Sequence, residues 1–425
     1  MHSGLLHRLR TVSPCQPKGS RLRLLALAIV LVSAALAVPS ASATTAGRSS
    51  TTTTVPPALI KTLPKDLQGL FTYTGDVVGP SLYGKFKPVK SPWKICFVDS
   101  YEGNPWRIDV HKSLDLLNAR FAKAGLTTGT LTAANSNLNE AVENTQIRQD
   151  VDRGCNAVID IAGSSTGTNA AYAYGYKKGV VMVTLDGSVT SPYVININSN
   201  AVLWARQMAQ AIVTRLGGDG NVIMVEGIAG NPSTVTEDEG ADQIFSKYPG
   251  IHVVAQVNGN WTPSVTKTVL VQALASHPET IGAVWDTGGE CKVIAETFQE
   301  AGRPYPLISC APGADSLAYL HDNPSVTFFG GDIAPTWTAD FGFRVAVRLL
   351  EGQHPKLNTL YVQIPSFSTK ALEALYRPCM TEASQEPWAV EPVDPLPDSW
   401  LNGYFWNGKA TPPFNYKTDD PQPCG

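Results

Sequence analysis

The stretch "ICFVDSYEGNPWRIDVHKSL", residues 95–114, contains the pattern that decides the fold of this chain. It begins with four apolar residues in succession, which is typical of a strand buried on both faces of a parallel sheet. A predicted helix begins at Ile108, and the turn before it holds Asn104, Pro105 and Trp106. A large aromatic side chain is unfavourable in an exposed turn. The sequence therefore predicts that Trp106 contacts either another part of the protein or a bound molecule.

The alternation of apolar strands and helices continues along most of the chain. Apolar runs predict strands at residues 95–98, 157–161, 180–185, 222–225, 251–257, 281–285, 306–310 and 326–329. Predicted helices separate most of them, at residues 108–124, 139–153, 169–178, 203–216, 237–248, 264–276 and 292–301. This alternation is typical of βαβ units and parallel sheets. The pattern spans roughly 270 residues, too many for one open sheet, so we predict two doubly wound, Rossmann-like α/β lobes.

Composition excludes several classes of function. The chain has 425 residues, of which 43% are hydrophobic, and its formal net charge is -3. Lys and Arg do not cluster outside the N-terminal region, which argues against a nucleic-acid partner. No G-x-G-x-x-G follows the first strand, and the chain contains no P-loop and no H-E-x-x-H. We therefore predict no nucleotide cofactor and no zinc site.

The N-terminal region predicts export. Basic residues precede an apolar run at residues 24–38, and Ala41-Ser42-Ala43 then forms an A-x-A cleavage site. This is the pattern of a secretory signal peptide, residues 1–43, cleaved near Ala43. The alternative is a membrane anchor, but the apolar run has about 15 residues and a span needs about 20. The expected location is the periplasm, the cell envelope or the extracellular space.

The cysteine positions predict disulfide bonds. Cys15 lies in the signal peptide and six cysteines remain, an even number for which fifteen pairings exist. Cys96 and Cys155 open neighbouring strands at the same end of a sheet, while Cys291 begins a helix and Cys310 ends the next strand. We therefore predict the pairs Cys96–Cys155, Cys291–Cys310 and, as the remainder, Cys379–Cys424.

Polar and aromatic residues follow the predicted strands. A doubly wound sheet binds its ligand at the carboxyl ends of its strands, so these positions are candidates for a site. The candidates are Asn104, Trp106, Ser164, Ser165, Asp186, Asn200, Trp261, Asp286 and Asp332. Tryptophan covers the C–H faces of a ring, and carboxylates accept pairs of hydroxyl hydrogen bonds. The set therefore suits a polyhydroxylated ligand.

Most of these residues also have a structural interpretation. Trp106 would then fill the core or the space between the lobes, and Trp261 would pack within its own turn. Asp186 and Asp286 would cap the turn or helix after them, and Asn200 would cap the long helix that follows it. The sequence leaves both interpretations open.

One catalytic motif is present. Residues 163–167, "GSSTG", match the G-x-S-x-G elbow of serine hydrolases, between a predicted strand and a predicted helix. Ser165 would be the nucleophile. None of the downstream histidines follows a strand end where the partner base is expected, so an exported serine hydrolase is the alternative function rather than the main prediction.

Four stretches together resemble a known family. "GNPW", "VVMVTLDGS", "ININSN" and "VIMVEGIAGNPST" occur in this order within residues 92–365. They resemble the ribose/galactose-type periplasmic binding proteins, the solute-capturing components of ABC importers. The resemblance implies the type I fold of that family, with two lobes that close on a ligand and three chain crossings between them. It also implies a monomer without enzymatic activity, a sugar-like ligand and an ABC transporter permease as the membrane partner. A ligand sensor for a membrane receptor would use the same lobe closure.

The resemblance also implies roles for single residues. Trp106 matches an aromatic that stacks on the sugar, Asp186 matches an aspartate that binds its hydroxyls, and Trp261 lies near a second stacking position. Five expected polar positions differ, since the chain has Gly187, Val235, Gly288-Gly289 and Ala311 there. The identity of the ligand therefore does not follow from the resemblance.

Interruptions of the βαβ pattern near Ser199, Asp332 and Lys356 predict the three hinges. The predicted parts are a linker and N-terminal extension at 44–92, a first lobe at 93–198 and 332–356, a second lobe at 199–331 and 357–368, and a C-terminal strap at 369–425. The strap is rich in proline and tryptophan. We expect it to lie on the lobes, with a partner-docking surface as the alternative.

Overall fold

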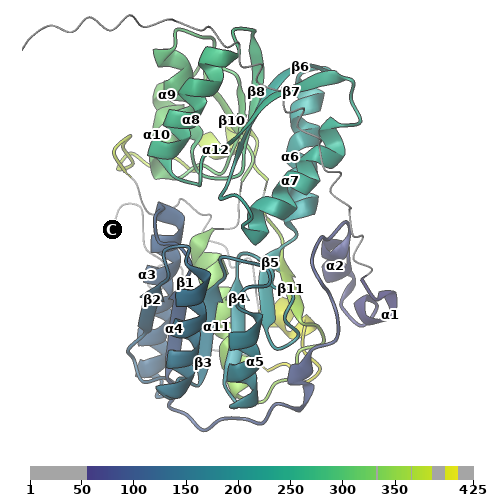
Figure 1. Ribbon diagram of the computed structural model, residues 1–425, viewed down its shortest axis with the longest axis vertical. Helices are drawn as coiled ribbons and strands as arrows, with labels where there is room; N and C mark the ends of the chain where they lie inside the picture. The colour runs from purple at the N-terminus through teal and green to yellow at the C-terminus, as the bar shows by residue number, and fades with distance from the viewer. Residues whose placement is uncertain (1–54, 332–333, 365, 385–397, 410–425) are drawn as a thin grey trace, which may run out of the picture. The chain divides into compact units, whose positions relative to one another are not determined.

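The computed structural model describes residues 55–331, 334–364, 366–384 and 398–409. These residues form two α/β lobes, each built on a sheet whose strands all run parallel (Figure 1). The predicted fold class is confirmed.

The first lobe contains a six-stranded sheet in the order β11-β5-β4-β3-β1-β2. Its strands are β1 (Ile95–Asp99), β2 (Thr132–Asn135), β3 (Ala157–Ile161), β4 (Val181–Leu185), β5 (Ile195–Ser199) and β11 (Thr359–Val362). One face is covered by α3 (Pro105–Lys123) and α11 (Pro335–Leu350), the other by α4 (Glu140–Asp152) and α5 (Asn169–Lys177). The sheet is therefore buried on both sides, as its apolar strands predict.

The second lobe contains a five-stranded sheet in the order β10-β9-β8-β6-β7. Its strands are β6 (Asp219–Glu226), β7 (Gly250–Asn258), β8 (Ile281–Asp286), β9 (Leu307–Ser309) and β10 (Thr327–Phe329). Helices α6 (Ala201–Arg215) and α7 (Pro232–Phe245) cover one face, and α8 (Pro263–Ser276), α9 (Cys291–Glu300) and α10 (Ala314–Asp322) the other. The strand order reverses between β1 and β3 in one lobe and between β6 and β8 in the other, and ligands bind at such points.

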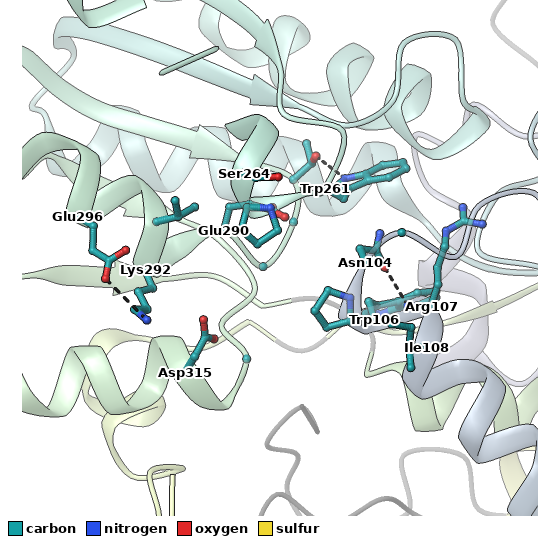
Figure 2. A pocket seen from close by; sticks show the side chains of 18 of the residues that line it. Asn104, Trp106, Arg107, Ile108, Trp261, Ser264, Glu290, Lys292, Glu296 and Asp315 are labelled. Carbon is teal, nitrogen blue, oxygen red and sulfur yellow. Dashed lines mark hydrogen bonds and ion pairs between the residues drawn. The ribbon is translucent and has the colours of Figure 1, made fainter. Parts of the chain in front are cut away.

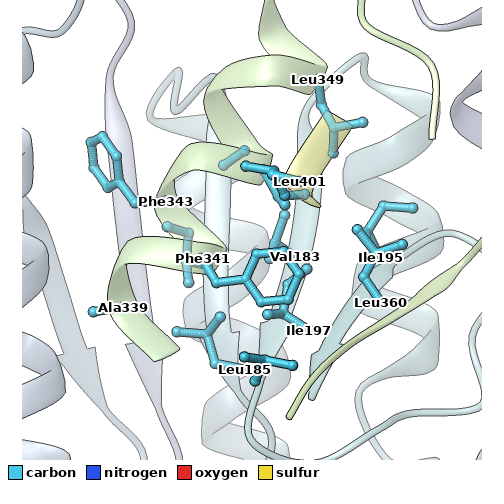
Figure 3. Close-up of a cluster of buried hydrophobic side chains, with 14 of the residues drawn as sticks. Val183, Leu185, Ile195, Ile197, Ala339, Phe341, Phe343, Leu349, Leu360 and Leu401 are labelled. Atoms are coloured by element: carbon cyan, nitrogen blue, oxygen red, sulfur yellow. The ribbon is translucent and has the colours of Figure 1, made fainter. Parts of the chain in front are cut away.

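Helix α11 is the central core element of the first lobe. All sixteen of its residues are buried, and Figure 3 shows Phe341 and Leu349 within one cluster with Val183, Ile197 and other strand residues. Its polar residues Asp340, Arg344 and Arg348 recur every four residues, as on an exposed helix face, but they are buried as well. Tertiary partners such as Asp398 make this burial possible, and a local sequence pattern does not show them.

The N-terminal extension is part of the first lobe. It contains α1 (Pro57–Ile60), α2 (Lys65–Gln68) and the short 3₁₀ helices η1 (Gly69–Phe71) and η2 (Leu82–Lys85). Leu67 and Tyr83 are fully buried in the core of that lobe, as is Leu401 of α13 (Asp398–Gly403) near the other end of the chain. The residues from 57 onward are therefore not only a linker, because they supply side chains to the core of the first lobe.

Three strands were not predicted. β2 and β11 are short edge strands, and β5 contains Asn196 and Asn198, which break the apolar run. Both asparagines are buried, and their side chains are hydrogen-bonded, for example by Thr184 to Asn196 at 2.8 Å. Burial of polar groups is tolerated when they have such partners.

One domain boundary was wrong. β11 pairs with β5, so residues 359–362 belong to the first lobe and not to the second. The third crossing consequently follows Val362 rather than Lys356, and α12 (Thr369–Glu373) then packs in the second lobe. The other two crossings follow Ser199 and β10. Asp332, the predicted second hinge, lies outside the described residues.

Two of the predicted disulfides are confirmed. Cys96–Cys155 and Cys291–Cys310 are bonded, with Cα–Cα distances of 6.0 and 5.7 Å. Cys424 of the third pair lies outside the described residues, and so does the predicted signal peptide. Within the described ranges, no helix has the length and apolar character needed to cross a membrane.

Candidate functional site

A cavity of about 470 Å³ lies at the carboxyl ends of the strands of both sheets (Figure 2). Residues after β1 and β4 line it from the first lobe, and residues after β6, β7, β8 and β9 line it from the second. Its size is ordinary for a small-molecule site. Four predicted site residues line it, namely Asn104, Trp106, Asp186 and Trp261.

Trp106 belongs to both the core and the cavity wall. Helix α3 begins at Pro105, so Trp106 lies in its first turn rather than in the preceding loop. The side chain of Asn104 caps the helix by accepting a hydrogen bond of 2.9 Å from the backbone N–H of Arg107. Proline suits the next position because a first-turn residue needs no N–H. The Trp106 side chain is 8% exposed, packs in the first-lobe core and lines the cavity.

A buried ion pair lies behind this wall. The Arg107 guanidinium donates to Asp99, the last residue of β1, and to the hydroxyl of Ser100 at 3.2 Å. Burial raises the pKa of Asp99, and the Arg107 charge opposes that rise. The second terminal nitrogen of Arg107 has no hydrogen-bond partner among the described residues. Arg107 lines the cavity and was not predicted.

Asp186 follows β4 with φ of 47°, a left-handed conformation that Asp tolerates better than most residues. Its backbone carbonyl accepts a hydrogen bond of 2.9 Å from the hydroxyl of Ser233 in α7, which also lines the cavity. Burial raises the pKa of the Asp186 carboxyl to about 6, while Arg107 lowers it and Asp99 raises it. The Asp186 carboxyl is therefore about half protonated near pH 6.

Trp261 is the aromatic of the second-lobe wall. Its indole N–H donates a hydrogen bond of 2.9 Å to the hydroxyl of Thr287, just after β8 (Figure 2). The ring lies against Gly227 and Gly288, since a Cβ at either position would clash with it. Gly288 occupies a position where the resemblance predicts a polar side chain. The glycine leaves space that the indole and the Glu290 carboxylate use instead.

Several acidic residues lie on the second-lobe wall. Glu290, Glu296 and Asp315 line the cavity, with Lys292 between them in Figure 2. Lys292 forms an ion pair of 3.7 Å with Glu296 and donates to the carbonyl of Glu382. These residues come from α9, the start of α10 and the segment after α12, so local sequence gave no sign of their convergence. Among these residues, Glu290 closely follows a predicted strand, the same strand that precedes the predicted Asp286. Glu290 could therefore have been predicted as a site residue from its position in the sequence.

The remaining predicted site residues do not line the cavity. Ser164 accepts hydrogen bonds from the backbone of its own turn, and the carbonyl of Ser165 accepts one of 2.8 Å from Thr190. Asn200 caps α6 through Leu203, and its amide donates to the carbonyls of Leu70 and Thr72 in the N-terminal segment.

Asp286 is buried at the end of β8 and accepts from the backbone N–H of Glu290 at 3.3 Å. Burial raises its pKa to about 7. Through its bond to the Glu290 N–H, Asp286 takes the capping role in the turn after β8 that the sequence left open. Asp332 lies outside the described residues.

The sequence profile described as "Periplasmic binding protein domain" matches residues 95–354, more than half of the chain. The chain belongs to the periplasmic binding protein family. The match includes every strand that borders the cavity of this binding protein. A xylitol-binding protein of Mycolicibacterium smegmatis is 23% identical over 251 residues, 58% of this chain and 71% of that protein.

Solved structures have the same fold. An ABC transporter solute-binding protein from Thermobispora bispora superposes with a TM-score of 0.62 at 23% identity, covering 70% of this binding protein and 92% of that chain. The periplasmic binding protein of a Shewanella arabinose ABC transporter, bound to L-arabinofuranose, gives a TM-score of 0.60 at 17% identity. The superposition covers 66% of this binding protein and 93% of that chain. At these identities the likeness concerns the fold.

Proposed function

We propose that this chain is an exported solute-binding protein that captures a sugar or polyol between its two lobes and delivers it to an ABC importer. The observation that supports it is one cavity lined by Trp106 from the first lobe and Trp261 from the second, and also by carboxylates and an amide. Such a combination fits the C–H faces and hydroxyl groups of a small carbohydrate.

The relatives support the same conclusion. The similar proteins include one named for xylitol and one bound to an arabinofuranose. We further propose cleavage of the signal peptide near Ala43, action as a monomer, and the transporter permease as the partner. We propose that the protein delivers its ligand without catalysing a reaction. The turn that contains Ser165, the candidate nucleophile, lies outside the residues that line the cavity, which is consistent with this proposal.

A ligand screen tests the proposal. Purified protein is titrated with pentoses, hexoses, their furanosides, polyols and the amino derivatives of these compounds, with thermal unfolding and intrinsic tryptophan fluorescence as readouts. A ligand at 100 times its Kd stabilises the folded state by about 2.7 kcal/mol. We expect at least one compound to raise the melting temperature and change the fluorescence, and Ser165→Ala to leave that binding unchanged. Failure of the whole panel in both assays, or hydrolysis abolished by Ser165→Ala, would overturn the proposal.

A further inference from the structure

The charges along the cavity do not balance. Of the described residues that line it, six have carboxylates and two, Arg107 and Lys292, have cationic groups. Arg107 is already paired with Asp99, and Lys292 with Glu296. Within the part of the chain that the structure describes, neither cation forms an ion pair with Asp186, Glu290 or Asp315.

Glu290 is the clearest case. Its side chain lines the cavity, is only 4% exposed, and its Oε2 has no hydrogen-bond partner among the described residues. Because position 288 is glycine, the carboxylate approaches that backbone closely, where a larger residue would displace it. A buried carboxylate oxygen without a donor is costly. A bound ligand is the natural source of that donor.

The carboxyl groups near Glu290 add to the excess of negative charge at the cavity. Burial raises the pKa of Glu290, and the charges of Asp286 and Asp315 raise it further. Burial also raises the pKa of Asp315 to about 6, with Glu296 adding to the rise and Lys292 opposing it. A positive charge brought into the cavity would lower these pKa values and stabilise the ionised carboxylates.

We infer that the ligand of this site has a protonated amine in addition to its hydroxyl groups, as in an amino sugar or amino polyol. The ammonium group lies against Glu290 and Asp315, and the ring or chain lies between Trp106 and Trp261. Aromatic faces also attract cations. This inference rests on the proposed function and specifies the chemical class of its ligand.

The geometry favours an organic cation over a metal ion. Among the described residues, the one group of three potential ligands with atoms within 4.8 Å of one another is Cys96, Asp150 and Cys155. Its two sulfur atoms form a disulfide, and it lies outside the cavity. The carboxylates of the cavity therefore do not converge closely enough for a hard cation, which needs several oxygen ligands at 2.3–2.6 Å or less.

Matched ligands test the inference. Isothermal titration at pH 7.5 compares D-glucose, D-galactose and D-xylose with their amino counterparts and, for the hexosamines, with the neutral N-acetyl forms. We expect an amino compound to bind at least about tenfold more tightly than its neutral partner. Glu290→Gln keeps the shape but removes the charge, so it should reduce that binding at least about tenfold. Asp315→Asn provides a second variant on a less buried residue.

The control is Glu300→Gln, which lies at the exposed far end of α9 and pairs with Lys267. It should leave all affinities unchanged, and melting temperatures verify that each variant is folded. If neutral sugars bind as tightly as the amines, or both cavity variants retain full affinity for the amine, the inference is wrong while the proposed function stands. If neither neutral nor amino compounds bind, both are wrong.

Discussion

The indole N–H of Trp261 donates a hydrogen bond of 2.9 Å to the hydroxyl of Thr287, and this bond orients the aromatic wall of the second lobe. Trp261 itself has φ of 50°, a left-handed conformation that is unusual for a bulky residue. Such backbone conformations persist where the surrounding structure enforces them, and they cluster at binding sites. The ring is therefore held in place by its indole N–H and by the two glycines beneath it.

Thr287→Val removes the acceptor while keeping the side-chain shape. We expect ligand affinity to fall about 3- to 10-fold, in line with the loss of one buried hydrogen bond. Thr268→Val on the exposed side of α8 is the control. Titration calorimetry measures both variants. Unchanged affinity in Thr287→Val would show that the indole does not need this bond.

Removal of either aromatic ring should weaken binding. We expect Trp261→Ala to cost about 1–3 kcal/mol of binding free energy. Trp106 is also a core residue, so Trp106→Phe is the better variant and should cost less. Fluorescence titration gives both affinities, and melting curves separate folding from binding. Full affinity in both variants would contradict the stacking role.

Ligand binding should close the lobes about the crossings after Ser199, β10 and Val362. A ligand that touches both lobes stabilises the closed state by its differential affinity for that state. Small-angle scattering with saturating ligand should then give a smaller radius of gyration. An unchanged radius with ligand verified as bound would rule out this closure.

The buried acids Glu143 and Asp160 should make stability depend on pH. Burial and the charge of Glu143 raise the pKa of Asp160, and Tyr172 donates a hydrogen bond to Asp160. Burial raises the pKa of Glu143 from 4.5 to about 7, and that of Asp160 well above its usual value. The folded state therefore holds protons that the unfolded chain releases above about pH 4.5.

The free energy of unfolding should consequently fall between pH 5 and pH 8. Asp160→Asn removes one titrating group, so its fall should be smaller by about 1–3 kcal/mol. Asp99 and Arg107 also act on Glu143 and remain in place. Urea unfolding at both pH values measures the difference, with the exposed Asp152→Asn as the control. Equal pH slopes in Asp160→Asn and the parent would refute the assignment.

The C-terminal segment should stabilise the first lobe through Asp398. Its carboxylate accepts hydrogen bonds of 2.7 Å from Arg344 and 2.9 Å from Arg348, two buried side chains of α11. Asp398→Asn leaves this buried charge less compensated and should cost about 2–4 kcal/mol of unfolding free energy. The exposed Asp322→Asn should cost less than about 0.5 kcal/mol. Similar values for the two variants would show that the network contributes little.

The sequence by itself determined the class of fold and the edge where the site lies. Apolar runs without alternation bury both faces of a strand, so they predict parallel sheets wherever they recur between helices. The carboxyl ends of such strands meet at one edge, and this places Asn104, Trp106, Asp186 and Trp261 around one cavity. Strand positions also determined the pairs Cys96–Cys155 and Cys291–Cys310.

Only the tertiary structure decided which residues complete the cavity and the core. β5 and α11 contain buried polar residues whose partners lie far away in sequence, so a local hydrophobic pattern does not detect them. Glu290 and Asp315 follow different strands, and they become neighbours only when β8 and β9 pair. Periodicity reports which face of an element is buried, whereas packing alone determines what that face meets.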